Sequence, residues 1–293
     1  MLKKKLTTSP ATPATSKGTT KYAKIMERIK PVSNLGLTIA ALFYGRAGTG
    51  KTTVACSFPG PALHLDIREK GTDSVTDVKD LDSLPITEWD EFEQAYWYVA
   101  SGQSPYKTVI IDAVSQLQDL AVEKAMEDDG KEAGSLVTKR QWGTAAGYLK
   151  TWIVNYRDLV DLGIHVVFCA HDRTTEGEEG EDGELTPTVG PRIMPSVASI
   201  LTAAVKLTGN TFIRESIKKL EGGKIERTVI YSMRLGPHAF YSTKVRQPKG
   251  SYVPDVLDNP NFESLVQIMK GEFPRPEPKT DSKVTKKILK KGN

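Results

Sequence analysis

Short apolar runs alternate with amphipathic stretches from Gly36 onward. The runs LTIAALFYG, ALHLDI, KTVIIDA and IHVVFCAHD have the length and composition of buried strands, and the stretches between them carry apolar residues at helical spacing. This alternation is typical of a mostly parallel, twisted sheet flanked by helices, which is the α/β class of fold.

Several amphipathic stretches are predicted helices. KTTVACSF directly follows a glycine-rich loop, and further helices are predicted through QLQDLAVEKAMEDD and from about Gln141 to Leu162. In EWDEFEQAYWYVA, Trp89, Phe92 and Tyr96 share one helix face, which we interpret as core packing rather than as a platform for stacking bases. The segment NPNFESLVQIMKG has Asn before Pro at the predicted first helical position and Gly after the predicted end, which are start and stop signals of a helix.

The C-terminal half has a weaker pattern. Residues 173–187, RTTEGEEGEDGELTP, contain almost no apolar residues and are predicted to form a loop. The segments SVASILTAAVKLT, TFIRES, KIERTVIYSMR and AFYSTKVR mix helix and strand signals. We expect them to close the domain with C-terminal β hairpin segments, with EGGK at 221–224 as a turn.

Charge divides the chain into an acidic body and two basic ends. Residues 1–30 have a net charge of +7, residues 279–293 have +5, and the intervening 31–278 have −8. Both ends are rich in Lys, Ser, Thr, Pro or Gly and poor in aromatic residues, a composition typical of disorder. We therefore predict disordered basic tails at 1–30 and 273–293 around one domain at 31–272. Such tails either keep the chain soluble or attract a polyanion.

Two classes of protein are disfavoured by the sequence. No run approaches the roughly 18 apolar residues of a membrane helix, and the N-terminus lacks the apolar centre of a secretory signal. We expect a cytoplasmic protein with no membrane partner. Cys56 and Cys169 are the only cysteines and are expected to be buried, so their spacing supports neither a disulfide framework nor a zinc site.

The stretch FYGRAGTGKTT carries the clearest chemistry. Gly45, Gly50, Lys51 and Thr52 fit the phosphate-binding pattern G-x-x-x-x-G-K-[ST], with a predicted strand before it and a predicted helix after it. Its backbone amides would surround the β-phosphate, Lys51 would reach the β and γ oxygens, and the Thr52 hydroxyl would bind Mg²⁺. We therefore expect ATP and Mg²⁺ as cofactors. The expected nucleotide-binding residues are Gly45, Arg46, Ala47, Gly48, Thr49, Gly50, Lys51, Thr52 and Thr53.

Polar side chains also follow the predicted strands, where ligands bind in open parallel sheets. Asp112 closes TVIID and is expected to be the second Mg²⁺ contact, with a helix cap as the alternative. His171 closes VVFCAH and is expected to contact the γ-phosphate or its attacking water, with a structural histidine as the alternative.

Hydrolysis also needs a base or a group that positions water. Glu69 lies just beyond ALHLDI and is favoured over Asp66 because its side chain reaches further. Its neighbours Arg68 and Lys70 would help to keep it ionised. An exposed charged turn is the alternative reading of these residues.

The order of these elements resembles the RecA-like ATPases, and more closely the phage-encoded RecA-core family. That family consists of small nucleotide-binding proteins from recombination modules that are linked to single-strand annealing. The resemblance covers roughly residues 37–250 and rests on GRAGTGKTT, LDIREKG, VIIDAVSQL, FCAHDR and STKVR. It implies a RecA-like P-loop NTPase domain with Glu69 as the catalytic glutamate, Asp112 as the Mg²⁺-side aspartate and His171 as the polar sensor.

The segment STKVRQ is similar to the Lys-x-Arg pair with which RadA- and DnaB-like proteins reach the nucleotide of the adjacent subunit. Lys244 and Arg246 lie two apart on a predicted strand, so both side chains should project to one face. The resemblance implies that they act catalytically across an interface, and therefore that the protein self-associates into a ring or filament. Two cations on a solvated strand face are the alternative.

One feature departs from the family. Residues 176–184 contain six carboxylates and no cation, although the corresponding loop of RecA-like recombinases faces DNA. Arg173, Arg192 and the basic tails could carry DNA contact instead. Otherwise the acidic loop mimics DNA or docks a partner, or the chain does not bind DNA at all.

The leading hypothesis is an ATP-hydrolysing RecA-like protein that acts on single-stranded DNA in phage recombination or annealing. A single-strand-binding or replication protein is a further expected partner. One alternative is a P-loop ATPase that loads or remodels a protein partner. Another is a nucleotide-gated binding module without turnover.

Overall fold

The computed structural model describes residues 29, 37–132, 134–176, 187–219 and 225–276. The chain divides into a unit Met1–Leu37 and a unit Thr38–Asn293, and the second contains all the elements below. Most of both predicted tails, and the predicted turn at 221–224, lie outside the described residues. None of the helices in the described ranges has the length and apolar character needed to span a bilayer.

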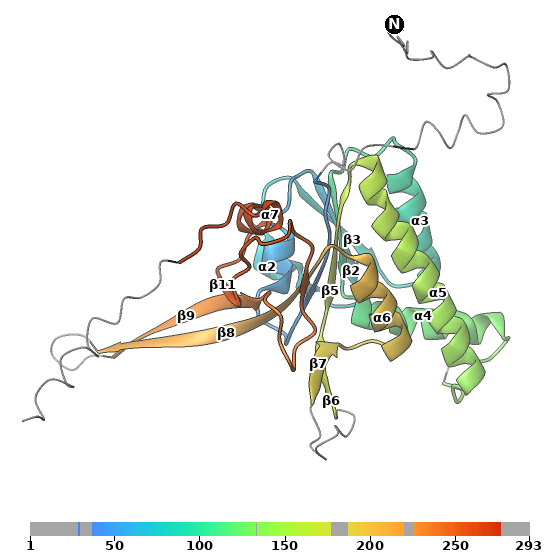
Figure 1. Ribbon diagram of the computed structural model, residues 1–293. Coiled ribbons are helices and arrows are strands. Elements are labelled where there is room, and N and C mark those ends of the chain that lie inside the picture. Colours follow the sequence, from blue (N-terminus) through green and yellow to red (C-terminus); the bar gives the residue numbers. More distant parts are fainter. Residues whose placement is uncertain (1–28, 30–36, 133, 177–186, 220–224, 277–293) are drawn as a thin grey trace, which may run out of the picture. The chain divides into compact units, whose positions relative to one another are not determined.

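A single large sheet forms the centre of the second unit (Figure 1). In the described residues it has nine strands in the order β11-β9-β8-β1-β5-β4-β2-β3, with β10 also paired to β8. The strands from β8 to β3 in this order run parallel, whereas β9, β10 and β11 are antiparallel to their neighbours. The predicted mostly parallel α/β fold is confirmed. The strands are β1 (Ala40–Tyr44), β2 (Ala62–Ile67), β3 (Leu81–Ile86), β4 (Thr108–Asp112), β5 (His165–Ala170), β8 (Leu207–Lys219), β9 (Ile225–Arg234), β10 (Lys244–Val245) and β11 (Val256–Asp258).

Helices cover both faces of this sheet (Figure 1). On one face are α3 (Trp89–Ala100), α4 (Val114–Asp128), α5 (Lys139–Asp158) and α6 (Pro195–Ala204), and on the other α2 (Lys51–Ala55) and α7 (Phe262–Lys270). Successive side chains of β1 point to opposite faces of the sheet. Leu42 and Tyr44 belong to the larger hydrophobic core, whereas Phe43 packs against Phe58 on the other face. Because both faces are covered, β1 is apolar throughout and entirely buried.

The aromatic residues of α3 belong to the core, as predicted. Trp89 and Phe92 are buried, and the partly buried Tyr96 packs against the same cluster. The Phe92 ring stacks on Tyr156 with 4.6 Å between ring centroids, and the Tyr156 hydroxyl donates a hydrogen bond of 2.8 Å to the Phe92 carbonyl. These contacts fix α3 against α5.

Truncating this cluster should destabilise the fold strongly. Phe92→Ala is expected to lower the free energy of unfolding by about 3–5 kcal/mol, because it leaves a cavity beneath Tyr156. Trp97→Ala in the same helix removes a ring that is 63% exposed, so a change within about 0.5 kcal/mol is expected. Urea denaturation of both variants measures the difference, and equal effects would contradict this view of the core.

Some elements differ from the predictions. β6 (Asp172–Thr175) pairs antiparallel with β7 (Thr188–Pro191), so the prediction of a loop through 173–187 is wrong for 173–175. This hairpin is joined by polar contacts, such as the 2.8 Å contact between the Thr175 and Thr188 hydroxyls, and therefore has no apolar periodicity. The rest of the acidic loop, 177–186, lies outside the described residues.

Three further differences concern element limits. The predicted strand through AFYSTKVR is wrong for most of its length, because only Lys244–Val245 forms a strand. The edge strand β3 was not predicted, because it contains Pro85 and buries only Ile86. The long helix α5 ends at Asp158, and Leu159–Leu162 forms a 3₁₀ turn.

Candidate functional site

The glycine-rich loop joins the carboxyl end of β1 to the start of α2. β1 lies between β5 and β8, with Tyr44 in register with Ala170 and Asn210. A Cβ at Gly45 would overlap the carbonyl oxygen of Thr211. Gly50 has a φ of 84°, in the left-handed region that favours glycine. Both glycines of the motif are therefore required by the local geometry.

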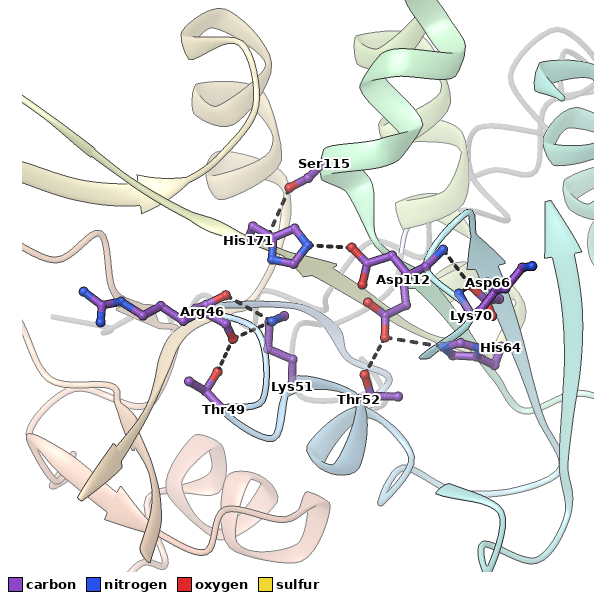
Figure 2. A network of polar contacts seen from close by, with 12 residues as sticks. Arg46, Thr49, Lys51, Thr52, His64, Asp66, Lys70, Asp112, Ser115 and His171 are labelled. Carbon is purple, nitrogen blue, oxygen red and sulfur yellow. Dashed lines mark hydrogen bonds and ion pairs between the residues drawn. The ribbon is translucent and has the colours of Figure 1, made fainter. Parts of the chain in front are cut away.

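Lys51 and Thr49 stabilise the loop from two sides (Figure 2). The buried Lys51 ammonium donates hydrogen bonds to the carbonyls of Gly45 (3.0 Å) and Arg46 (2.9 Å). The Thr49 hydroxyl donates to the Arg46 carbonyl (2.8 Å) and lies 2.7 Å from the Thr211 hydroxyl on β8. The Lys51 ammonium is thus held at the loop where phosphates would lie. Thr49 connects the loop to β8 of the sheet.

Asp112 ends β4 beside the start of α2. Its Oδ2 accepts a hydrogen bond of 2.6 Å from the Thr52 hydroxyl and lies 3.4 Å from His64 Nε2. Burial acts to raise the pKa of Asp112, but the hydrogen bonds from His64 and Thr52 and the charge of Lys51 outweigh it and hold the pKa below the usual range. Asp112 is therefore a carboxylate at neutral pH.

The arrangement around Asp112 fits a magnesium ion. Its Oδ1 is buried and, within the described residues, has no hydrogen-bond partner. An unpaired buried carboxylate oxygen is costly, and together with the Thr52 hydroxyl it offers the hard oxygen ligands that Mg²⁺ prefers. Thr52 and Asp112 are the residues that would hold the ion, as expected from the motif.

His64 was not expected at this site. It lies on β2, is 1% exposed, and shares its sheet face with Asp112, because Asp66 two residues later is in register with Asp112. Nothing local in the sequence marks this contact. The pairing of β2 with β4 brings the two side chains together.

Glu69 and His171 meet across the end of β4. Glu69 follows β2 by two residues and His171 directly follows β5, and β4 lies between these strands. The distance between Glu69 Oε1 and His171 Nε2 is 2.5 Å, and the two side chains are 22% and 19% exposed. The His171 backbone N–H donates to the Ser115 hydroxyl at 3.0 Å (Figure 2). The structure therefore brings the predicted base and the predicted sensor into direct contact.

Asp66 has a different position from Glu69. It is 7% exposed, and its Oδ1 accepts hydrogen bonds from the backbone N–H groups of Glu69 (3.1 Å) and Lys70 (2.9 Å). Asp66 thus anchors the turn that carries Glu69.

The same turn has an unusual backbone. Arg68 and Lys70, on either side of Glu69, have φ values of 60° and 53°, which is costly for residues other than glycine. The Arg68 guanidinium forms two hydrogen bonds with the Glu123 carboxylate of α4, at 2.6 and 2.7 Å. Arg68, which was expected to help keep Glu69 ionised, is instead paired with Glu123, and the Glu69 carboxylate contacts His171.

Lys244 and Arg246 lie away from the phosphate loop of their own chain. β10 pairs with Leu207 and Thr208 at the start of β8, whereas the loop adjoins the later part of that strand. Lys244 Nζ donates to the carbonyls of Thr202 (2.7 Å) and Ala203 (2.9 Å), and Arg246 donates to that of Ala203 (2.9 Å). Both side chains project to one face, as expected, and there they cap the C-terminal end of α6.

Comparisons with known proteins give one family match. A family model described as AAA domain matches residues 38–246. Among solved structures, the flagellar accessory protein FlaH from Methanocaldococcus jannaschii is similar with a TM-score of 0.35 and 10% identity, over 75% of this chain and 84% of that one. The search of curated proteins gives no match. On the family match and the phosphate loop, the chain belongs to the AAA domain family and is a P-loop NTPase.

Proposed function

We propose that this protein is an ATP- and Mg²⁺-dependent ATPase that acts on single-stranded DNA in phage recombination or annealing. One observation carries the ATPase part of the proposal. Asp112 accepts a hydrogen bond from the Thr52 hydroxyl through Oδ2, and its buried Oδ1 has no partner within the described residues, at the strand end spanned by the Glu69–His171 pair. This combination supports a metal site and a carboxylate base at the carboxyl edge of one sheet.

The residues have distinct roles in the proposed reaction. The backbone amides of Gly45–Thr53 and the Lys51 ammonium would bind the phosphates, and Thr52 and Asp112 would hold Mg²⁺, which would supply positive charge to neutralise the phosphates. Glu69 accepts the proton of the attacking water or orients that water. His171 Nε2 lies 2.5 Å from Glu69 Oε1, and on ATP binding the same ring would contact a γ-phosphate oxygen or the attacking water.

The DNA part of the proposal rests on the resemblance and on charge. The basic segments 1–30 and 279–293 and the exposed Arg173 and Arg192 are available for phosphate contacts. The six carboxylates at 176–184 act against such contacts in their vicinity. DNA binding through the tails would therefore depend strongly on salt.

ATP turnover with and without single-stranded DNA tests the proposed function. We expect turnover to rise on addition of DNA, and with about six phosphate contacts the logarithm of affinity should fall with the logarithm of salt at a slope of about −4. Turnover that DNA leaves unchanged would instead favour an ATPase that loads or remodels a protein. ATP binding without any turnover would favour a nucleotide-gated module.

The Lys-x-Arg pair provides a prediction about self-association. Arg246→Ala and Lys51→Ala should each inactivate a homo-oligomer, but a mixture of the two should regain part of the activity if Arg246 serves the neighbouring subunit's nucleotide. In such a mixture, some sites combine an intact loop with an intact arginine. The ATP turnover of the mixture is compared with the turnover of each variant alone. If the mixture is no more active than either variant, Arg246 does not serve the neighbouring subunit and its role is to cap α6.

A further inference from the structure

A groove extends from the phosphate loop to α6. It consists of two adjoining cavities of about 380 and 460 Å³, which share Val189 and Tyr241 as lining residues. The first borders Arg46 of the phosphate loop and Arg234 of β9. The second borders Arg173 of β6 and the exposed Phe240. We call this feature the β7 groove.

The β7 groove is lined by both cations and aromatic rings. Among its described lining residues are three arginines, Arg46, Arg173 and Arg234, whereas Asp172 is the single carboxylate. The Arg234 guanidinium lies between two rings, 3.8 Å from the centroid of Phe212 and 4.1 Å from that of Tyr241. Phe240 is 43% exposed in the second cavity and has no comparable cation over its ring among the described contacts.

The β7 groove reaches the phosphate loop at the pair of strands β8 and β9. Asn210 and Arg234 are directly paired on these strands and therefore share a face. Ile213, at an odd offset from Asn210, also lines the first cavity, so residues from both faces of the strand pair border that cavity. Tyr231, the partner of Ile213, lies against Gly50 at the start of α2.

From this arrangement we infer that the β7 groove binds single-stranded DNA. A cationic groove follows the phosphate backbone, and exposed aromatic rings stack on bases without regard to sequence. The inference rests on the proposed function, and it assigns part of the DNA contact to the folded domain in addition to the basic tails. Arg173 and Phe240 are both exposed and offer these two kinds of contact.

Hydrogen bonds connect the β7 groove to the phosphate loop. Arg234 donates to Asn210 Oδ1 at 3.0 Å, and the buried Asn210 donates to the Tyr44 carbonyl at 3.3 Å, directly before the loop. The Tyr44 hydroxyl donates to the Val189 carbonyl at 3.1 Å, in the wall of the groove. A DNA strand in the groove would therefore contact groups that hold the start of the loop, which provides a route for DNA to affect ATP turnover.

The test measures binding of a fluorescent single-stranded oligothymidylate to the full chain at about 0.2 M salt, where binding by charge alone is weak. The double variant Arg173→Ala/Phe240→Ala should bind at least about tenfold more weakly than wild type, because it loses a stacking ring and a phosphate contact. Its DNA-independent ATP turnover should be unchanged. The matched control Arg140→Ala/Trp97→Ala removes the same residue class and a larger ring at exposed sites outside the groove, and should bind like wild type.

Affinity of the groove variant within about twofold of wild type overturns the inference while leaving the proposed function intact. Equal losses in the groove and control variants also overturn it. If wild type itself does not bind the oligonucleotide, both the inference and the DNA part of the proposed function fail.

Discussion

Glu69→Gln is expected to lower ATP turnover by about 10²–10⁴-fold while leaving ATP binding nearly unchanged. Glutamine keeps the size of the side chain and can still contact His171, but it cannot accept a proton from water. Within the described part of the chain, the Glu69 carboxylate is hydrogen-bonded to His171 and not to the phosphate loop, so we expect ATP binding to depend little on its charge. Single-turnover phosphate release and calorimetric ATP binding measure the two quantities separately.

Asp66→Asn is the matched control for this substitution. The asparagine oxygen can still accept the hydrogen bonds from the N–H groups of Glu69 and Lys70, so the turn should persist and turnover should change little. If Asp66→Asn abolished turnover and Glu69→Gln did not, the assignment of the base would be reversed.

Asp112→Asn is expected to reduce Mg²⁺-dependent turnover by about 10²-fold or more. The substitution removes the negative charge that would hold the ion, and a metal ion contributes several kcal/mol to stabilising charge in such reactions. The asparagine oxygen can still accept from Thr52, so the fold should be retained. Turnover measured as a function of Mg²⁺ concentration should show both a lower maximum and a higher requirement.

Asp119→Asn provides the comparison for Asp112→Asn. Asp119 is an exposed residue of α4, outside the site, and its replacement should leave the Mg²⁺ dependence unchanged. An unaltered Mg²⁺ requirement in Asp112→Asn would contradict the proposed ligand.

The central strands could be predicted because helices cover both faces of the sheet. β1 and β4 are buried at every position and therefore appear as continuous apolar runs. The phosphate loop could also be predicted from the sequence, because its glycines, lysine and threonine occur at fixed spacing within one short segment. In both cases the determining interactions are local in sequence.

Other features depend on contacts between distant segments. Glu69 and His171 are 102 residues apart, and His64 and Asp112 are 48 apart, so their contacts arise only from the strand order β5-β4-β2. The β6–β7 hairpin is polar and half-exposed, and consequently lacks the alternation by which strands are recognised. The β7 groove likewise combines residues from the phosphate loop, β6, β9 and the segment after β9.

We propose that the loop from Gly45 to Thr53 holds a nucleoside triphosphate together with Mg²⁺. Calorimetric titration of the purified chain with ATP and MgCl₂ measures this binding, with Lys51→Ala as the comparison. Wild type should show saturable binding that weakens when Mg²⁺ is chelated and is lost in Lys51→Ala. Absence of ATP binding by folded wild-type protein in the presence of Mg²⁺ would mean that this loop is not a nucleotide site.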